Sequence, residues 1–137
     1  MSQILGIDYG RKRCGIAVAQ EGSTFAVPVE TVPTEQLLEW IKGFAAQEGL
    51  SYIVLGLPLS RDGAETEMSK EVRKVQAGLV EGGFLVKLHN EFKSSQSADL
   101  LLRHASKKKK SKKGIRDEMS ASLILQEYLE FQELSRS

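Results

Sequence analysis

The chain begins with short, hydrophobic, β-rich runs that are separated by turns. Residues 3–9 and 14–20 lie on either side of a short, basic, glycine-containing turn, and this pattern predicts a β-hairpin. After a second turn, the run from Phe25 to Val32 predicts a third strand. Three consecutive strands joined by short turns predict an antiparallel meander.

Helical and strand patterns alternate after the meander. Apolar side chains recur at helical spacing after Pro33, so we expect a helix that Thr34 caps and Gly49 ends. The continuous apolar run at 52–57 predicts a central strand that is covered on both faces. Further patterns predict helices over 66–81, 94–105 and about 115–131, and a strand over 84–89.

This order of elements predicts a single α/β domain over residues 1–137. A meander followed by alternating helices and strands is typical of a mixed five-stranded sheet, in which two parallel strands join the antiparallel meander and helices cover both faces. The length of 137 residues is enough to bury a core, and a hydrophobic content of 41% is ordinary for a globular protein. One cysteine, Cys14, cannot form an internal disulfide and is typical of a reducing compartment. No apolar stretch approaches the ~20 residues that cross a bilayer and no signal-peptide pattern is visible, so we expect a cytoplasmic protein.

Positive charge is concentrated in one short segment. The formal net charge is only +1, yet residues 107–116 hold 7 of the 19 basic residues and no acid. Such a segment predicts a polyanionic partner, and a solvated, flexible surface loop over about 105–114 is an equally open interpretation. Both interpretations hold together if the loop becomes ordered on nucleic acid.

Asp8 is a carboxylate inside a predicted strand, where an unpaired charge is costly. Strand alternation places Ile4, Gly6, Asp8 and Gly10 on one face, and the two glycines leave room beside the acid for a metal ion or a phosphate. The alternative is a turn residue that bonds to its own backbone.

Two further acids are candidate partners of Asp8. Glu91 follows the last predicted strand, at the end of a sheet where ligands gather, although a solvated loop glutamate is the simpler interpretation. Asp117 opens the last predicted helix, where an acid commonly complements the helix dipole. Helical spacing, however, places it on one stripe with Ser120, Ala121, Ile124 and Tyr128, which predicts that it faces the sheet.

Three carboxylates from separate elements can converge on one site. Oxygen ligands favour Mg²⁺ or Mn²⁺ over zinc, which prefers histidine and cysteine. Two such ions, about 3.5–4 Å apart, would support phosphodiester hydrolysis.

Four segments of the chain resemble the YqgF family, which is also called RuvX and whose members are described as Holliday junction resolvases or pre-16S rRNA nucleases. They are GIDYGRKRCGIAVA (residues 6–19), VLGLPL (54–59) with Asp62-Gly63 after it, NEFKSSQSA (90–98) and DEMSASLILQEYL (117–129). The resemblance implies an RNase H-like fold in which Asp8, Glu91 and Asp117 form an acidic triad that binds divalent metal.

This resemblance implies a metal-dependent endonuclease that acts on structured nucleic acid, as a monomer or a homodimer. The expected cofactor is Mg²⁺ or Mn²⁺ as two ions, and the expected activity is processing of the 5′ end of pre-16S rRNA or, alternatively, resolution of Holliday junctions. We expect the phosphate groups to be bound by basic residues at two places: Arg11, Lys12 and Arg13, and Lys93, Lys107, Lys108, Lys109, Lys110, Lys112 and Lys113.

The third segment departs from the family pattern. Asn90 stands where the family has Asp, Phe92 replaces Arg and Ser95 replaces Thr, so a negative charge and a planar phosphate-binding group are missing. A nucleic-acid-binding protein with weak catalysis therefore stays open. Actin-like kinases also begin with Gly-Ile-Asp-x-Gly, but they close two such domains on a nucleotide, and we expect one domain here.

Overall fold

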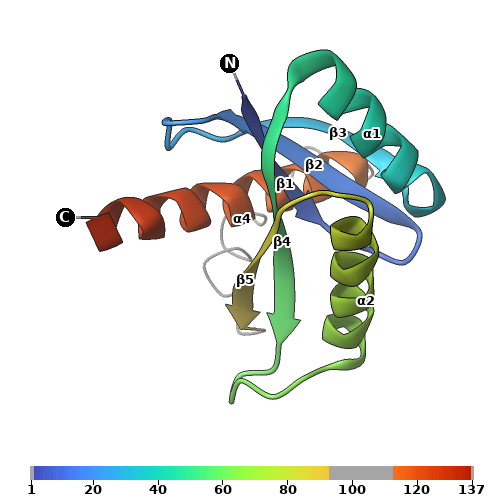
Figure 1. The fold of residues 1–137 in the computed structure, drawn as a ribbon. Coiled ribbons are helices and arrows are strands. Elements are labelled where there is room, and N and C mark those ends of the chain that lie inside the picture. Colours follow the sequence, from blue (N-terminus) through green and yellow to red (C-terminus); the bar gives the residue numbers. More distant parts are fainter. Residues whose placement is uncertain (1, 93–112, 137) are drawn as a thin grey trace.

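The computed structural model describes residues 2–92 and 113–136. The strands are β1 (Gln3–Asp8), β2 (Arg13–Gln20), β3 (Val27–Pro33), β4 (Leu50–Leu59) and β5 (Val86–Phe92). They form one five-stranded sheet of order β3-β2-β1-β4-β5 (Figure 1). β1, β2 and β3 pair in antiparallel fashion, whereas β4 and β5 run parallel to β1. The predicted sheet, a meander joined by two parallel strands, is confirmed.

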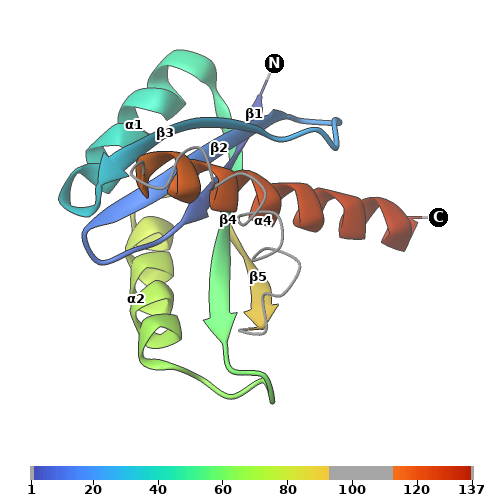
Figure 2. The ribbon, with the colours of Figure 1, turned by 180° about the vertical axis from the view of Figure 1, so that it is seen from behind.

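Helices cover both faces of the sheet, as predicted. The 3-10 segment η1 (Thr34–Gln36) leads into α1 (Leu37–Glu48), which with α2 (Glu67–Glu81) lies on one face. The long helix α4 (Lys113–Arg136) crosses the other face (Figure 1, Figure 2). The helix expected over 94–105 lies outside the described residues. Residues 105–112 of the expected basic loop also lie outside them, whereas residues 113 and 114 of that loop begin α4. Within the described parts, no helix is long and apolar enough to cross a membrane.

Strand alternation divides the hydrophobic core into two layers. Leu5 and Ile7 of β1 pack with residues of α1 and α2, whereas Ile4 packs with residues of α4. β4 contributes Leu55 to the first layer and Val54 to the second, so the predicted burial of this strand on both faces is confirmed. The α4 layer contains Ile4, Ala17, Ala19, Ala26, Val54, Ala121, Ile124, Leu125 and Leu129.

Two details of the sequence prediction are wrong. The last strand extends from Val86 to Phe92 instead of ending at His89, because its parallel partner β4 continues to Leu59 and pairs with it throughout. Thr34 does not cap a helix: the segment begins after Pro33 without a side-chain cap, and the Thr34 hydroxyl donates to the carbonyl oxygen of Gly10 at 2.6 Å. Gly49 ends α1 as expected, with a positive φ of 79°.

Candidate active site

The three predicted acids belong to elements that meet at the carboxyl ends of the parallel strands. Because β1, β4 and β5 are parallel, their carboxyl ends lie together, and this is where α/β sheets bind ligands. Asp8 is the last residue of β1, and Glu91 lies inside β5, opposite Pro58 of β4, instead of following the strand. Asp117 lies near the start of α4, past its first turn, which contains no acid. The helix-dipole interpretation of Asp117 therefore lacks support.

Gly56 separates Asp8 from Glu91 and provides the space between them. Its strand, β4, lies between β1 and β5. A Cβ atom at position 56 would collide with the Glu91 carboxylate oxygen Oε2 and would lie only 2.7 Å from Ile124 Cδ1 of α4. The missing side chain thus lets Glu91 fold over the middle strand, beneath α4. Gly56 lies in the family-like segment VLGLPL, but sequence reasoning did not assign it to the site.

Electrostatic interactions couple the three acids of the site to their neighbours. Burial raises the pKa of Asp8 from 3.8 to about 7, and the negative charge of Asp117 adds to this shift. Burial likewise raises the pKa of Glu91 from 4.5 to about 8, with further contributions from Asp8 and Glu127. Each of the three predicted acids is therefore coupled to a neighbour, and the shared negative charge is unfavourable unless a proton or a cation balances it.

The donor chemistry of this site fits a hard divalent cation. All three predicted ligands are carboxylates, the type that Mg²⁺ and Mn²⁺ bind. Among the described residues, no three acidic, histidine or cysteine side chains stand close enough together to hold one ion. Binding of one ion by Asp8, Glu91 and Asp117 together would therefore require these side chains to move closer to one another.

The raised pKa values predict that the metal-free protein loses stability as the pH rises. The folded state keeps protons on Asp8 and Glu91 up to a pH of about 7 to 8, whereas the unfolded chain releases them near 4. The free energy of unfolding should therefore fall between these pH values, by an amount on the order of several kcal/mol, since one unit of pKa shift corresponds to about 1.4 kcal/mol. Denaturant unfolding in EDTA at pH 5 and pH 8 measures this change.

The variant Asp8→Asn isolates the contribution of Asp8 because asparagine carries no charge at either pH. We expect a smaller loss of stability between pH 5 and pH 8 in this variant than in the wild type. The exposed acid Glu39 provides the control Glu39→Gln, which should retain the wild-type pH dependence. Identical pH dependence in all three proteins would contradict the assignment.

A fourth acid, Glu127 of α4, lies beside the site. Its charge contributes to the raised pKa of Glu91, and its Oε1 lies 3.2 Å from His89 Nε2. His89, expected at a strand end, instead lies within β5 and packs edge-on against Tyr128 at 6.2 Å. Sequence reasoning missed Glu127, although its helical spacing from Asp117 and Ile124 places it on nearly the same side of α4.

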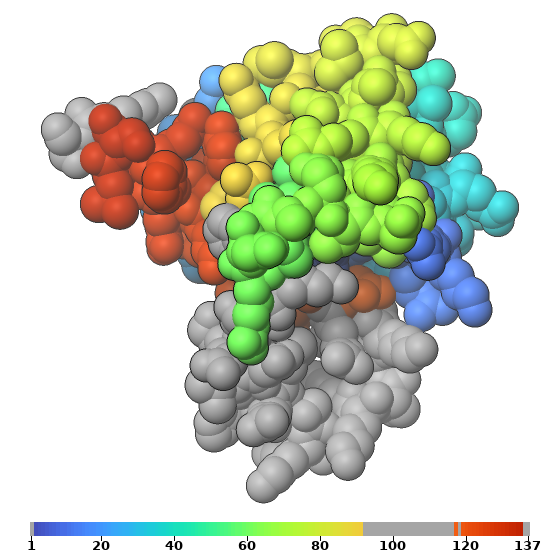
Figure 3. All heavy atoms as spheres, turned by 90° about the horizontal axis from the view of Figure 1, so that it is seen from below, coloured from blue at the N-terminus to red at the C-terminus, as the bar shows by residue number. Residues whose placement is uncertain are grey.

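The predicted phosphate-binding residues are only partly described. Arg11 and Lys12 are exposed in the turn that directly follows Asp8, and Arg13 begins β2. Figure 3 looks at this end of the molecule and shows both the β1–β2 turn (blue) and the loop after β4 (green). Of the predicted lysines, Lys113 begins α4, and the other six, Lys93, Lys107, Lys108, Lys109, Lys110 and Lys112, lie outside the described residues.

The fold is RNase H-like. A solved structure with the same fold is Thermus thermophilus RuvC, described as "T. thermophilus RuvC in complex with Holliday junction substrate". The TM-score is 0.57 over 97% of this chain and 96% of the RuvC chain, at 13% sequence identity. Such low identity supports the shared fold alone.

Sequence comparison then identifies the family. The family model RuvX, described as "Holliday junction resolvase", matches residues 2–131, and the chain belongs to this family of nucleases. Relatives named "Putative pre-16S rRNA nuclease" include a Bacteroides fragilis protein, 37% identical over 98% of this chain and 100% of its own length. Another, from Chlorobaculum tepidum, is 36% identical over 93% of both chains. The family and the RNase H-like fold expected from the sequence are confirmed.

Proposed function

We propose that this protein is a divalent-metal-dependent endonuclease that hydrolyses phosphodiester bonds in structured nucleic acid. The observation that carries the proposal is the electrostatic coupling of three acids from separate elements, Asp117 to Asp8 and Asp8 to Glu91, with the Glu91 carboxylate lying over Gly56. Such a site is costly without a cation, since burial and mutual repulsion raise the pKa values of Asp8 and Glu91. Carboxylates arranged in this way bind the ions that phosphoryl chemistry requires.

Each side chain has a distinct part in the proposed reaction. Asp8 is coupled electrostatically to both of the other acids, and the three carboxylates of Asp8, Glu91 and Asp117 would hold the Mg²⁺ or Mn²⁺ ions. Bound ions supply charge neutralisation and activation of water. Arg11 and Lys12 bind neighbouring phosphates of the substrate. The hydrolysis breaks the bond between phosphorus and the 3′ oxygen, and it leaves a 5′ phosphate and a 3′ hydroxyl.

The proposed substrate is the 5′ end of pre-16S rRNA. Support comes from relatives that are 36–38% identical at nearly full length and are named "Putative pre-16S rRNA nuclease". A Holliday junction is the second candidate, since the family description and the RuvC structure both refer to it. Phosphate contacts do not distinguish these substrates, because they position a nucleic acid without reading its identity.

A cleavage assay on both substrates tests the proposal. Purified protein is incubated with a 5′-extended 16S rRNA precursor, a mature-end control RNA and a four-way DNA junction, each with Mg²⁺, Mn²⁺ or EDTA. We expect cleavage of the precursor with either metal, none in EDTA, and little action on the mature-end RNA. Preferred cleavage of the junction would favour the second candidate. Binding without metal-dependent cleavage of any substrate would refute the endonuclease and favour a non-catalytic binding protein.

The lysine run predicts a steep dependence of binding on salt. Replacing Lys107–Lys110 with alanine removes four of the 19 basic residues and should weaken binding. Each lost phosphate contact lowers the slope of log affinity against log salt by about 0.9, so the slope should fall by up to about 3 to 4. Fluorescence anisotropy at several salt concentrations from about 50 to about 200 mM measures this slope.

A matched variant separates this local effect from the change in net charge. Four exposed lysines elsewhere in the structure, Lys42, Lys70, Lys74 and Lys87, are replaced together by alanine. This variant has the same net charge as the first but should retain most of the wild-type slope. Equal slopes in the two variants would show that the lysine run makes no phosphate contacts of its own.

A further inference from the structure

The turn between β1 and β2, residues 9–12, is fastened to neighbouring elements on two sides. On one side, the Thr34 hydroxyl donates to the Gly10 carbonyl oxygen at 2.6 Å, and the Thr34 backbone N–H donates to the Lys12 carbonyl oxygen at 3.0 Å. On the other side, Arg11 Nε donates to Glu71 Oε2 of α2 at 2.8 Å. Figure 1 shows the turn in this place, between the start of α1 and α2. The turn is therefore held in one position before any substrate binds.

Of these hydrogen bonds, the one from the Thr34 hydroxyl to Gly10 is not a consequence of strand pairing. The backbone bond to Lys12 continues the pairing of Arg13 with Pro33, but the hydroxyl bond crosses the turn to Gly10. It lies in a partly buried place, since Thr34 Oγ1 is 3.5 Å from the sulfur of the fully buried Cys14. The Gly10 carbonyl oxygen also accepts a long hydrogen bond from the Cys14 thiol at 3.9 Å, but a thiol is a weak donor, so the Thr34 hydroxyl provides the stronger of the two side-chain bonds.

Gly10 makes the turn tight enough to depend on this bond. A Cβ atom at position 10 would lie only 2.5 Å from the Arg13 carbonyl oxygen, so the backbone folds closely upon itself there. In this tight turn the Gly10 carbonyl oxygen faces Thr34 and accepts the short hydrogen bond from its hydroxyl.

Asp8 itself does not depend on Thr34. It ends β1 within the ladder and pairs with Gly15 of β2, so its backbone position is set before the turn begins. The residues that the turn does control are the exposed cations Arg11 and Lys12. The side chain of Arg11 is 62% exposed, and its bond to Glu71 uses one of the five N–H donors of a guanidinium group. The remaining donors can bind a phosphate.

We propose that Thr34 is a positioning residue for substrate: its hydroxyl holds the β1–β2 turn so that Arg11 and Lys12 bind phosphates of the nucleic acid directly beside Asp8. This inference rests on the proposed function and adds to it a residue that does not touch the substrate. A loosened turn still attracts phosphates through its charge, but it has to be ordered on binding, which lowers affinity. Thr34 therefore acts on substrate binding and KM, and not on the rate of the bound complex.

The variant Thr34→Val tests this role because it removes the hydroxyl and keeps the shape and the backbone N–H. We expect the Kd for the fluorescently labelled rRNA precursor, measured by anisotropy, to rise about fivefold to tenfold. In the cleavage assay KM should rise to a similar extent, with kcat within about twofold of the wild type. Thr34→Ser keeps the hydroxyl and should restore both values.

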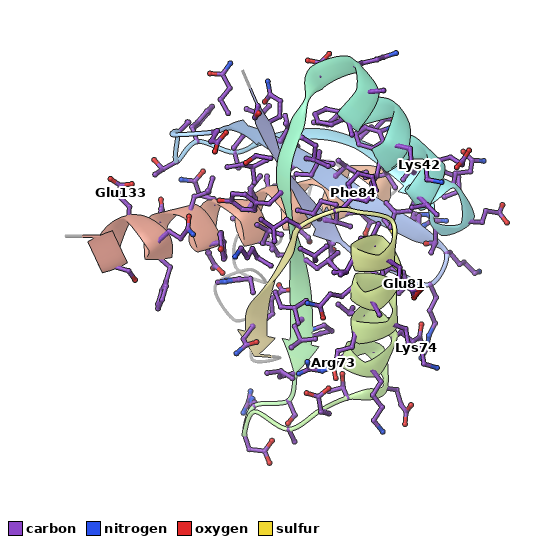
Figure 4. All side chains as sticks on the ribbon, viewed as in Figure 1. Lys42, Arg73, Lys74, Glu81, Phe84 and Glu133 are labelled. Carbon is purple, nitrogen blue, oxygen red and sulfur yellow. The ribbon has the colours of Figure 1, made fainter. Side chains whose placement is uncertain are left out.

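A double-mutant cycle distinguishes positioning from a general loss of structure. In the background Arg11→Ala/Lys12→Ala, the change Thr34→Val should have no further effect on Kd, because the cations that it positions are gone. In the control background Lys74→Ala, which removes a cation that projects from α2 (Figure 4), the full effect should persist. Additive effects in both backgrounds would overturn the proposal.

The binding measurement also separates this inference from the proposed function. If the wild type binds nucleic acid but does not cleave it with any metal, the endonuclease fails while the Kd values still decide the role of Thr34. If Thr34→Val binds as tightly as the wild type, or if it only lowers the melting temperature, Thr34 has no positioning role, whatever the cleavage assay shows.

Discussion

Replacing Asp8 with asparagine should reduce metal-dependent cleavage by at least about 10³-fold, the effect expected when an essential member of a catalytic group is removed. Asn has nearly the same shape but no charge, so it cannot neutralise a divalent cation. Asp8 is also the acid that is coupled to both others, since Asp117 raises its pKa and it raises that of Glu91. Initial rates on the rRNA precursor with saturating Mg²⁺ or Mn²⁺ measure the loss.

The loss should occur without unfolding. A neutral side chain at position 8 removes a charge from a place where charge is unfavourable, so the metal-free variant should unfold at the same or a higher temperature than the wild type at pH 8. Glu39→Gln, at an exposed acid on α1, is the matched control and should keep full activity. Equal cleavage by the wild type and Asp8→Asn would refute the role of Asp8 as a metal ligand.

The substitution Gly56→Ala should have the second-largest effect, a loss of roughly 10²-fold in kcat. The added Cβ would collide with the Glu91 carboxylate oxygen Oε2 and approach Ile124 of α4, so Glu91 or α4 would have to move. A displacement of about 1 Å in a catalytic group costs on the order of 10²-fold in rate. Single-turnover cleavage with saturating protein measures the chemical step directly.

Gly6→Ala provides a control that strains the same helix without touching Glu91. A Cβ at position 6 would lie 2.6 Å from Leu125 Cβ and 3.1 Å from the Ala121 carbonyl oxygen, so both variants should lose stability. Only Gly56→Ala should lose turnover per folded molecule, and adding Glu91→Gln to it should cause little further loss. If the two glycine variants lose turnover equally, the displacement of α4 is responsible and Glu91 is not.

The sheet and one of its acids could be predicted because their signals are local. Short runs and turns define the meander, and strand alternation correctly places Asp8 on the face with Ile4 and Gly6, against α4. Helical spacing correctly predicted that the stripe of Asp117, Ala121 and Ile124 faces the sheet, as the burial of Ala121 and Ile124 shows.

Long-range pairing explains the features that sequence reasoning did not predict. Glu91 lies inside a strand because β4, more than 30 residues earlier, extends far enough to pair with it. The contact between Arg11 and Glu71 joins residues 60 positions apart, and the Thr34 hydroxyl bonds to a carbonyl 24 positions away. The pattern of neighbouring residues in the sequence does not predict contacts between positions so far apart. For the third family-like segment, the loss of a negative charge at Asn90 and of a planar phosphate-binding group at Phe92 stays a prediction from the sequence.

The position of α4 in the chain has a consequence for the order of events during synthesis. Within the described residues, α4 is the one helix on the sheet face that carries Asp8, and it contributes Asp117. The sheet strands leave the ribosome first, as chains emerge from their N-terminus. Until residues 113–136 follow, that face lacks this helix and the third carboxylate is missing. The three acids can therefore come together only after α4 has docked on the sheet.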